Sequence, residues 1–424
     1  MIRFLAKGLW RDRSRSLFPT LVVTAGVMLT VVLYSYLKGS ENDIVRTAAS
    51  FRTGHVDVVT RAYAVEQDQV PNDLALVDLA MLLDELRTEH PRLVWTPRIR
   101  FVGLLDVPDE QGETRAQGPA VGLAVDLLSP DSPEPGILEL ARALVRGRMP
   151  AAPGEILLSD QFARRLALEP GGTVTLISAT MHGALATANF TLAGTLRFGV
   201  SAMDRGAIVA DLADVQVALD MTDAAGEVLG FFPDLVFRAG EARAVSERFS
   251  ARHPDPDDPF APVMRTLSER EGLGETLDMA NAIGGALVSL FVAIMSIVLW
   301  NAGLMSGLRR FGEFGVRLAI GEDKGHLYRT LLWEALIIGV VGTALGTAVG
   351  LVFARYLEVH GMDISPFLKN SSMMISDVLH ARITPLSWVI GLVPGLVATL
   401  LGTAMAGRGI YNRETARLTK ELQE

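Results

Sequence analysis

Long apolar runs dominate the pattern of hydrophobic and polar positions along the chain. Four segments of about 20 residues carry no charged residue in their middle, and a helix of that length crosses a bilayer core of about 30 Å. A buried helix of a soluble protein is seldom this long and apolar on every side. The pattern therefore predicts four transmembrane helices, over residues 17–37, 279–305, 331–353 and 386–406.

Residues 38–278 alternate short strand-like and helix-like pieces. Apolar–polar alternation favours strands, whereas apolar residues three or four positions apart favour helices. Strands are expected at 55–60, 98–107, 120–128, 155–158, 173–178, 190–198, 207–210 and 235–238. Helices are expected at 73–89, 137–145, 160–168, 212–219 and 241–253. These elements predict a large α+β domain with two subdomains, and a helical stalk that leads from it into the second membrane helix.

The N-terminal residues 1–16 combine five basic side chains with apolar ones. Two interpretations stay open: an interfacial amphipathic helix on the inner leaflet, or a positive flank that only sets topology. The apolar run that follows is too long for the apolar region of a signal peptide and has no A-x-A-like cleavage site. It is therefore read as an uncleaved membrane helix.

Basic residues are concentrated in the loop 306–330 and the tail 407–424, and they are sparser in the loop 354–385. Because positively charged segments remain in the cytoplasm, four spans with both termini inside satisfy this bias. The fold class predicted is an α-helical membrane protein with four transmembrane helices and a large extracytoplasmic α+β domain inserted between the first and second. The large domain would then lie outside the cytoplasm.

Composition narrows the possible functions. The chain has 424 residues, a formal net charge of -9 and no cysteine. No basic surface is available to neutralise nucleic-acid phosphates, so a nucleic-acid partner is not expected. Without cysteine, disulfides and thiolate metal sites are excluded.

Glycines recur at a spacing of four in the third and fourth predicted helices. Small residues at this spacing let two helix backbones approach closely within a membrane. Two interpretations are open, helix packing within the chain or a dimer seam with a second membrane chain. In the fourth helix Pro394 also permits a kink. The glycines are Gly342, Gly346, Gly350, Gly391 and Gly395.

The sequence contains no recognisable catalytic motif. It has no G-x-x-x-x-G-K-[ST] loop for nucleotide phosphates and no H-E-x-x-H or G-x-S-x-G signature. Its seven histidines show no metal-ligand spacing. The Pro- and Asp-rich residues 253–262 lack the glycine and spacing of a calcium loop, so a solvated linker is expected there. We therefore predict no catalytic, metal-binding or cofactor-binding residue in this chain.

The cytoplasmic loop carries the most specific pattern, LRRFGEFGVRLAIGEDKGHLYRTLL over residues 308–332. Its motif R-R-x-x-E-[IF]-G-x-[RK]-x-x-x-G resembles the FtsX-like permeases, the group that includes MacB, LolC and LolE. The layout of one N-terminal span, a large outer domain and three C-terminal spans agrees with that group. Two further stretches, residues 53–58 and 154–177, also resemble it.

The resemblance implies that the loop is a coupling helix that docks on a separate ATPase subunit, which would bind ATP and Mg. A positive loop with no partner is the alternative. Apolar anchors and charged contacts on such a helix suit a protein partner. The residues assigned to ATPase coupling are Arg309, Arg310, Glu313, Phe314, Gly315, Arg317 and Gly321.

The function implied is that of an ABC transporter permease subunit that is not itself an enzyme. The location implied is a bacterial inner membrane, with the large domain in the periplasm and both termini in the cytoplasm. Two permease chains would pair with two ATPase subunits, and ATP hydrolysis would move the outer domain by mechanotransmission. The cargo expected is a lipoprotein or another hydrophobic molecule of the inner membrane, and a periplasmic adaptor or chaperone is a further possible partner. The alternatives are a MacB-like efflux permease and an FtsX-like regulator of a cell-wall hydrolase.

Overall fold

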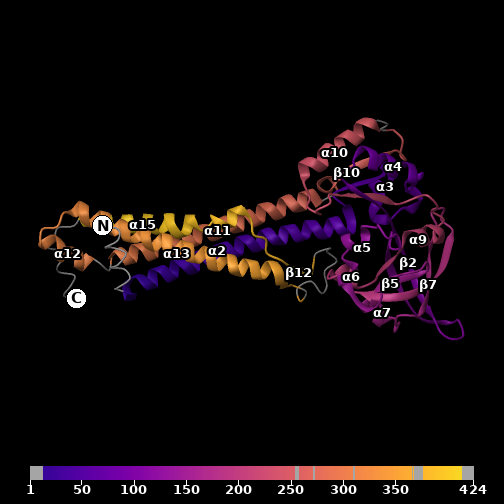
Figure 1. The fold of residues 1–424 in the computed structure, drawn as a ribbon, viewed down its shortest axis with the longest axis horizontal. Helices are drawn as coiled ribbons and strands as arrows, with labels where there is room; N and C mark the ends of the chain where they lie inside the picture. Colours follow the sequence, from indigo (N-terminus) through magenta and orange to yellow (C-terminus); the bar gives the residue numbers. More distant parts are fainter. Residues whose placement is uncertain are drawn as a thin grey trace. The chain divides into compact units, whose positions relative to one another are not determined.

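The computed structural model describes residues 13–253, 257–270, 273–308, 311–364, 366 and 376–412. The chain divides into two compact units (Figure 1). The helical unit comprises Met1–Asn42, Met279–Met362 and Leu379–Glu424, and the sheet unit comprises Asp43–Asp278 and Asp363–Val378. The sheet unit thus includes a segment from between the third and fourth candidate spans, whereas the sequence pattern placed the whole α+β domain between the first two.

Four helices in the described part of the chain are long and apolar enough to cross a membrane: Leu17–Thr53, Ala282–Met305, Lys324–His360 and Pro385–Arg408. The first runs through α2 (Arg13–Ala48) from Leu17 and through the π-helix η1 (Ala49–Thr53). The second lies in α11 (Leu273–Leu308), and the third is α13 (Lys324–His360). A short helix, α12 (Phe311–Ala319), lies between α11 and α13. The long helices run past the predicted apolar spans, because polar helix-forming residues continue the helix beyond them.

The fourth candidate span is not one regular α-helix. It contains the 3₁₀-helix η5 (Pro385–Trp388), the π-helix η6 (Val393–Ala398) and α15 (Thr399–Asn412). Pro394 lies in η6 and has no backbone N–H, so the regular α-helical hydrogen-bond ladder is interrupted there. The kink permitted by this proline in the sequence therefore takes the form of a π-helical segment.

The strands of the sheet unit form one hydrogen-bonded path in the order β10-β1-β9-β2-β3-β8-β5-β7-β4, with β6 pairing with β2 and β7. Their bounds are β1 (Val56–Thr60), β2 (Val94–Pro108), β3 (Thr114–Val125), β4 (Leu144–Gly147), β5 (Glu155–Ser159), β6 (Thr173–Ala179), β7 (Leu185–Leu196), β8 (Ala207–Asp211), β9 (Glu227–Phe231) and β10 (Pro262–Thr266). A small second sheet pairs β11 (Met362–Asp363) with β12 (Val378–Leu379). The long strand β2 pairs with β9 through Val94–Arg98 and with β3 through Ile99–Pro108, so it belongs to both parts of the large sheet.

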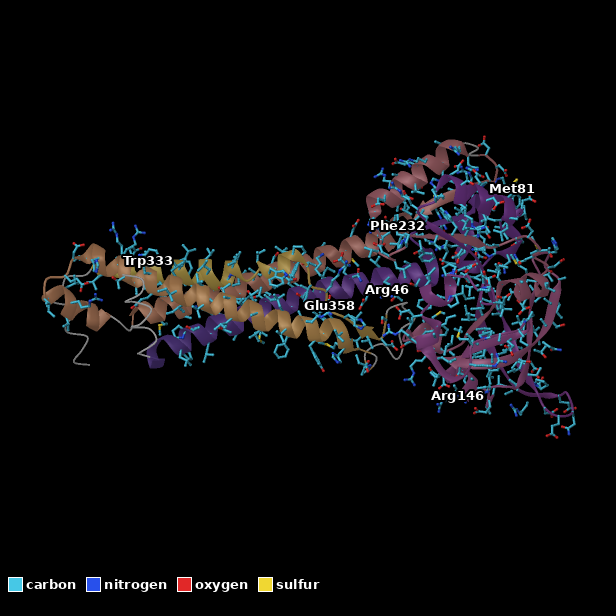
Figure 2. All side chains as sticks on the ribbon, viewed as in Figure 1. Arg46, Met81, Arg146, Phe232, Trp333 and Glu358 are labelled. Carbon is cyan, nitrogen blue, oxygen red and sulfur yellow. The ribbon has the colours of Figure 1, made fainter. Side chains whose placement is uncertain are left out.

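Helices and short turns pack around this sheet. They are α3 (Arg61–Glu66), α4 (Leu79–Glu89), α5 (Glu134–Ile137), α6 (Leu140–Ala143), α7 (Asp160–Arg165), α8 (Ser201–Asp204), α9 (Leu212–Ala218), α10 (Ala239–Arg252) and the 3₁₀-helices η2 (Gln67–Gln69), η3 (Asn72–Leu74) and η4 (Leu267–Glu269). Helix α4 illustrates the packing. Its leucines at 79, 82, 83 and 86 are buried in the main core, whereas Met81 is exposed on the opposite face (Figure 2).

Two predicted elements are wrong. The expected helix over 137–145 is interrupted because Glu139 has a φ of 50°, in the left-handed region, and Leu144 begins strand β4. The expected strand over 235–238 is irregular, with Leu235 at a φ of 54°, and the strand lies earlier, at β9. The stretch VLGF over residues 228–231 of β9 is apolar without alternation, which is typical of a strand buried on both faces.

Candidate coupling segment and helix-packing glycines

The residues predicted to couple to an ATPase fall on and around α12. Glu313, Phe314, Gly315 and Arg317 lie in α12, and Gly321 lies in the turn that follows it. Arg309 and Arg310 lie outside the described residues. Four of these residues thus share one nine-residue helix, which the sequence motif anticipates by its spacing.

A bidentate ion pair closes the turn after α12. Arg317 donates from Nε and Nη2 to the two carboxylate oxygens of Glu322, each at 2.7 Å. Gly321 has a φ of +96°, a conformation that other residues adopt at a cost, and its N–H donates to the carbonyl of Leu318 at 3.0 Å. Bidentate Arg–carboxylate pairs fix geometry as well as charge, so Arg317 holds the turn in shape.

Asp323 then starts the third long helix. Its carboxylate accepts a hydrogen bond from the N–H of His326 at 3.1 Å, as an N-cap residue does. Asp323 and Glu322 were not among the predicted site residues. The cap could have been predicted, because an Asp stands directly before a helical apolar run. The pairing of Glu322 with Arg317 could not, because it depends on the conformation of the turn between them.

Apolar side chains are exposed to solvent on α12 and in the turn that follows it. Ile320 is 82% exposed at the turn and Val316 is 48% exposed on α12, while Gly315 is buried. Exposed apolar groups beside charged ones are typical of a protein contact surface. We refer to Val316, Ile320 and the Arg317–Glu322 pair as the coupling surface.

The glycines of the third helix contact the first helix of the same chain. A Cβ atom added at Gly342 would lie 2.7 Å from Val23, one at Gly346 would lie 2.6 Å from the carbonyl oxygen of Thr24, and one at Gly350 would lie 2.9 Å from Val31. The two helices therefore match at a spacing of four residues over three successive contacts.

The glycines of the fourth span converge on the same helix. Cβ atoms added at Gly391 and Gly395 would each lie 2.5 Å from Val27, the fully buried valine that also faces Gly346. All five predicted glycines thus make contacts within one chain, and a seam with a second chain would use other faces. Other glycines also make close contacts, among them Gly303 against the carbonyl of Thr399 and Gly402 against the carbonyl of Trp300.

Comparison with known proteins identifies this region. A family model described as "FtsX-like permease C-terminal" matches residues 285–415, which include the coupling surface and all five glycines. The chain contains an FtsX-like permease domain. It is homologous to the LolC and MacB permeases of ABC transporters.

The relatives align over parts of their length. Two lipoprotein-releasing system transmembrane proteins LolC, from two strains of Xylella fastidiosa, are 26% identical over 213 and 262 residues, covering 49% and 60% of both chains. The macrolide export ATP-binding/permease protein MacB of Neisseria gonorrhoeae is 39% identical over 84 residues, 19% of this chain and 13% of that protein. The periplasmic region of MacB from Actinobacillus actinomycetemcomitans covers 53% of this chain at 12% identity, with a TM-score of 0.35. The chain therefore spans about half the length of the LolC relatives that it matches.

One helix of the permease domain is barely covered by the rest of the chain. In the apolar window of α11 only 6% of the residues are buried, compared with 33%, 39% and 44% in the other three candidate spans. A Cβ atom added at Gly284 or Gly285 would meet nothing within 4 Å. Helix α11 therefore presents an open apolar surface with small residues, whereas the glycine faces of the other helices are filled.

Proposed function

We propose that this chain is the permease subunit of an ABC transporter whose ATP hydrolysis is carried out by a separate ATPase subunit. The observation that carries the proposal is the coupling surface within the FtsX-like permease domain, where a rigid turn presents Ile320 and Val316 beside a fixed ion pair. The homology to the LolC and MacB permeases supports the assignment of this chain as a permease.

ATP and Mg would be bound by the ATPase partner, and this chain would supply no catalytic residue. Within the described ranges, no group of three or more His, Cys, Asp or Glu residues is arranged to hold a metal ion. The role of this chain would then be mechanical: a movement imposed at the coupling surface would travel along the long helices.

Two copies of the permease would associate in the membrane. The open surface of α11 supports this, because an apolar helix with small residues is suited to close helix contacts in lipid. The basic residues of the loop 306–330 and of the tail support an orientation with both termini in the cytoplasm of a bacterial inner membrane and the sheet unit in the periplasm.

A lipoprotein is the cargo that we favour. The alignment with LolC, a protein named for lipoprotein release, extends over 60% of the chain, well beyond the permease domain itself. The alignments with MacB cover 19% of the chain for Neisseria gonorrhoeae and 41% for Wolinella succinogenes. Efflux of a small amphiphile and control of a cell-wall hydrolase are the competing functions that an experiment has to separate.

The test is purification of the chain from its native membranes in mild detergent, followed by quantitative mass spectrometry. We expect an ATPase subunit and a lipoprotein to co-purify. Replacing the open anchor, Ile320→Ser, should lower ATPase recovery about tenfold, because loss of a central apolar contact costs more than 1.4 kcal/mol.

The matched control is Val217→Ser, which removes an equally exposed apolar side chain from the sheet unit. It should leave ATPase recovery unchanged. An adaptor protein in place of the lipoprotein would favour efflux, and a soluble wall enzyme would favour the regulator. Equal ATPase recovery with both variants would contradict docking at the coupling surface.

A further inference from the structure

Two buried arginines hold the end of the first long helix within the sheet unit. The last carbonyl groups of a helix have no partner inside it and form the negative end of its dipole. At the end of η1, which continues α2, Arg98 Nη1 donates to the carbonyl oxygen of Ser50 at 2.6 Å and Arg270 Nη1 donates to that of Arg52. Arg98 is fully buried and Arg270 is 4% exposed.

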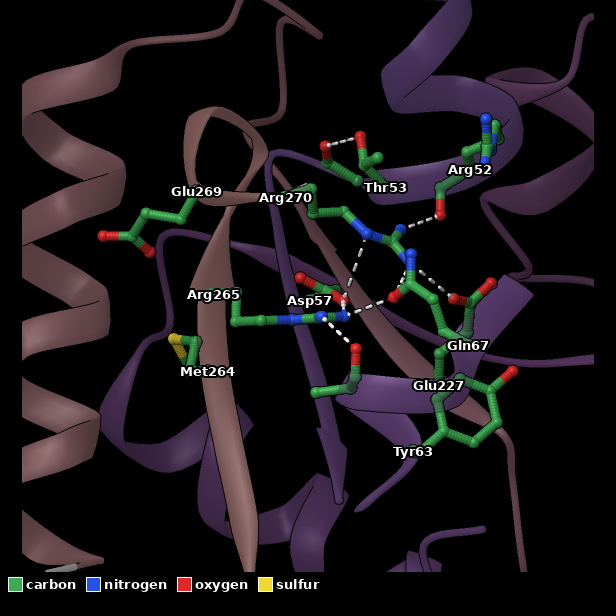
Figure 3. A network of polar contacts seen from close by, with 12 residues as sticks. Arg52, Thr53, Asp57, Tyr63, Gln67, Glu227, Met264, Arg265, Glu269 and Arg270 are labelled. Carbon is green, nitrogen blue, oxygen red and sulfur yellow. Dashed lines mark hydrogen bonds and ion pairs between the residues drawn. The ribbon is translucent and has the colours of Figure 1, made fainter. Parts of the chain in front are cut away.

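Arg270 is also held by the two strands beneath it (Figure 3). Its Nε lies 3.8 Å from the carboxylate of Asp57 on β1, and its Nη2 lies 3.8 Å from the carboxylate of Glu227 on β9. The same Nη2 donates to the side-chain oxygen of Gln67 at 2.6 Å. Both acidic residues are fully buried, so these charges interact with little screening by water.

Arg270 lies in the chain just before the second long helix, α11. Arg270 directly follows η4, where Thr266 and Glu269 form a reciprocal capping box and Leu267 is fully buried. Only three residues later, α11 begins at Leu273. One side chain thus joins the end of the first long helix to the segment that enters the second.

We infer that Arg270 is a positioning residue that clamps to the sheet both the end of the first long helix and the segment that precedes the second. The clamp consists of Arg270, the carbonyl of Arg52, and the side chains of Asp57, Gln67 and Glu227. Displacement of the end of the first long helix then reaches strands β1 and β9 through direct contacts, and the segment that leads to α11 is held at the same point. This role rests on the proposed function, because the clamp would transmit an ATP-driven movement of the helices to the sheet unit.

Arg265 provides a matched control. It contacts the same two oxygens, because it donates hydrogen bonds to Asp57 Oδ2 and Gln67 Oε1, and its third contact is the carbonyl of Ala64 on α3. Both Arg265→Gln and Arg270→Gln therefore remove one guanidinium from the same buried network. Each should lower the melting temperature by about 10 °C, so stability alone does not separate them.

The first experiment measures the joint directly and requires neither ATPase nor cargo. Because the chain has no cysteine, spin labels can be attached at Arg46→Cys near the end of α2 and Asp278→Cys near the start of α11. Both positions are exposed and lie in the sheet unit. The label-to-label distance distribution should be broader in Arg270→Gln and unchanged in Arg265→Gln. Equal distributions in both variants would overturn the clamp.

The second experiment measures coupling in the complete transporter with its ATPase. Arg270→Gln should reduce cargo released per ATP hydrolysed by about fivefold or more while ATP hydrolysis continues, and Arg265→Gln should change it by less than about twofold. If Arg270→Gln folds poorly, Arg270→Lys replaces it in this experiment. Lysine keeps the charge but lacks the several N–H donors of the guanidinium, so Arg270→Lys should show the same loss of coupling.

Equal coupling in the Arg270 and Arg265 variants would refute the clamp. Absence of release by the unsubstituted protein would refute the proposed function instead, and the distance measurement would still decide the clamp.

Discussion

His55 lies just after the end of the first long helix and is kept neutral by its surroundings. Its Nδ1 accepts a hydrogen bond from the backbone N–H of Phe232 at 2.9 Å, and its ring stacks on the Phe232 ring with centroids 5.2 Å apart. Burial lowers the pKa of His55 to about 4, with Asp234 and Arg238 adding opposing effects. Protonation would place a donor where the structure requires an acceptor.

The sheet unit should therefore lose stability as the pH falls below the pKa of a histidine in the unfolded chain. The unfolded pKa is 6.5 and the folded value about 4, so this contribution is complete above pH 6.5 and declines from there down to pH 4. Between pH 6.5 and pH 5 the free energy of unfolding should drop by about 2 kcal/mol. Chemical denaturation of the full chain in detergent at several pH values measures this.

The control for that prediction is His55→Gln, which can still accept the hydrogen bond from Phe232 but does not titrate. Its stability should be nearly flat over the same interval. If the substituted and unsubstituted proteins lose stability equally between pH 6.5 and pH 5, other groups cause the dependence and His55 is not the titrating residue.

At the scale of elements, the contact between α2 and α13 decides how the helical unit packs. Gly342, Gly346 and Gly350 match Val23, Val27 and Val31 one for one. Small residues opposite branched ones let the two backbones approach, and dispersion contacts then accumulate along the seam. A helix seam of this kind has no room for even one added methyl group.

Gly346→Ala should therefore destabilise the protein, because the new Cβ would lie 2.6 Å from the carbonyl oxygen of Thr24 and the helices would have to separate. Overpacking of this kind costs about 1–3 kcal/mol. Gly285→Ala on the open face of α11 is the matched control and should keep or slightly raise the stability, because alanine favours helix. Thermal unfolding in detergent compares them, and equal midpoints would show that α2 does not press on Gly346.

Sequence reasoning succeeded where the signal is local and repeated. The four apolar runs and the glycine spacing are periodic over many residues, so the candidate spans and their small faces could be predicted. It failed where a contact joins residues that are distant in sequence. The ion pair of Arg98 with Glu134 and the hydrogen bond of Arg270 to the carbonyl of Arg52 depend on which strands become neighbours. The sequence around either arginine contains no pattern that predicts these partners.

At the scale of the whole molecule, we propose that the coupling surface, the glycine contacts and the Arg270 clamp act in succession to transmit a movement. The coupling surface would receive movement from an ATPase, the glycine seam would make α2, α13 and the fourth span move together, and the clamp at Arg270 would pass that movement to the sheet. The open surface of α11 would be covered by the second permease copy. These roles require no catalytic chemistry from this chain.

The most direct test of the account is release of a lipoprotein from proteoliposomes that contain this chain, its co-purified ATPase and a fluorescent lipoprotein. The account predicts release into a periplasmic acceptor only with Mg and ATP, and none when the ATPase subunit is omitted or when ATP is replaced by a non-hydrolysable analogue. Release without ATP hydrolysis, or none with every component present, would contradict the assignment of this chain as an ATP-driven lipoprotein permease.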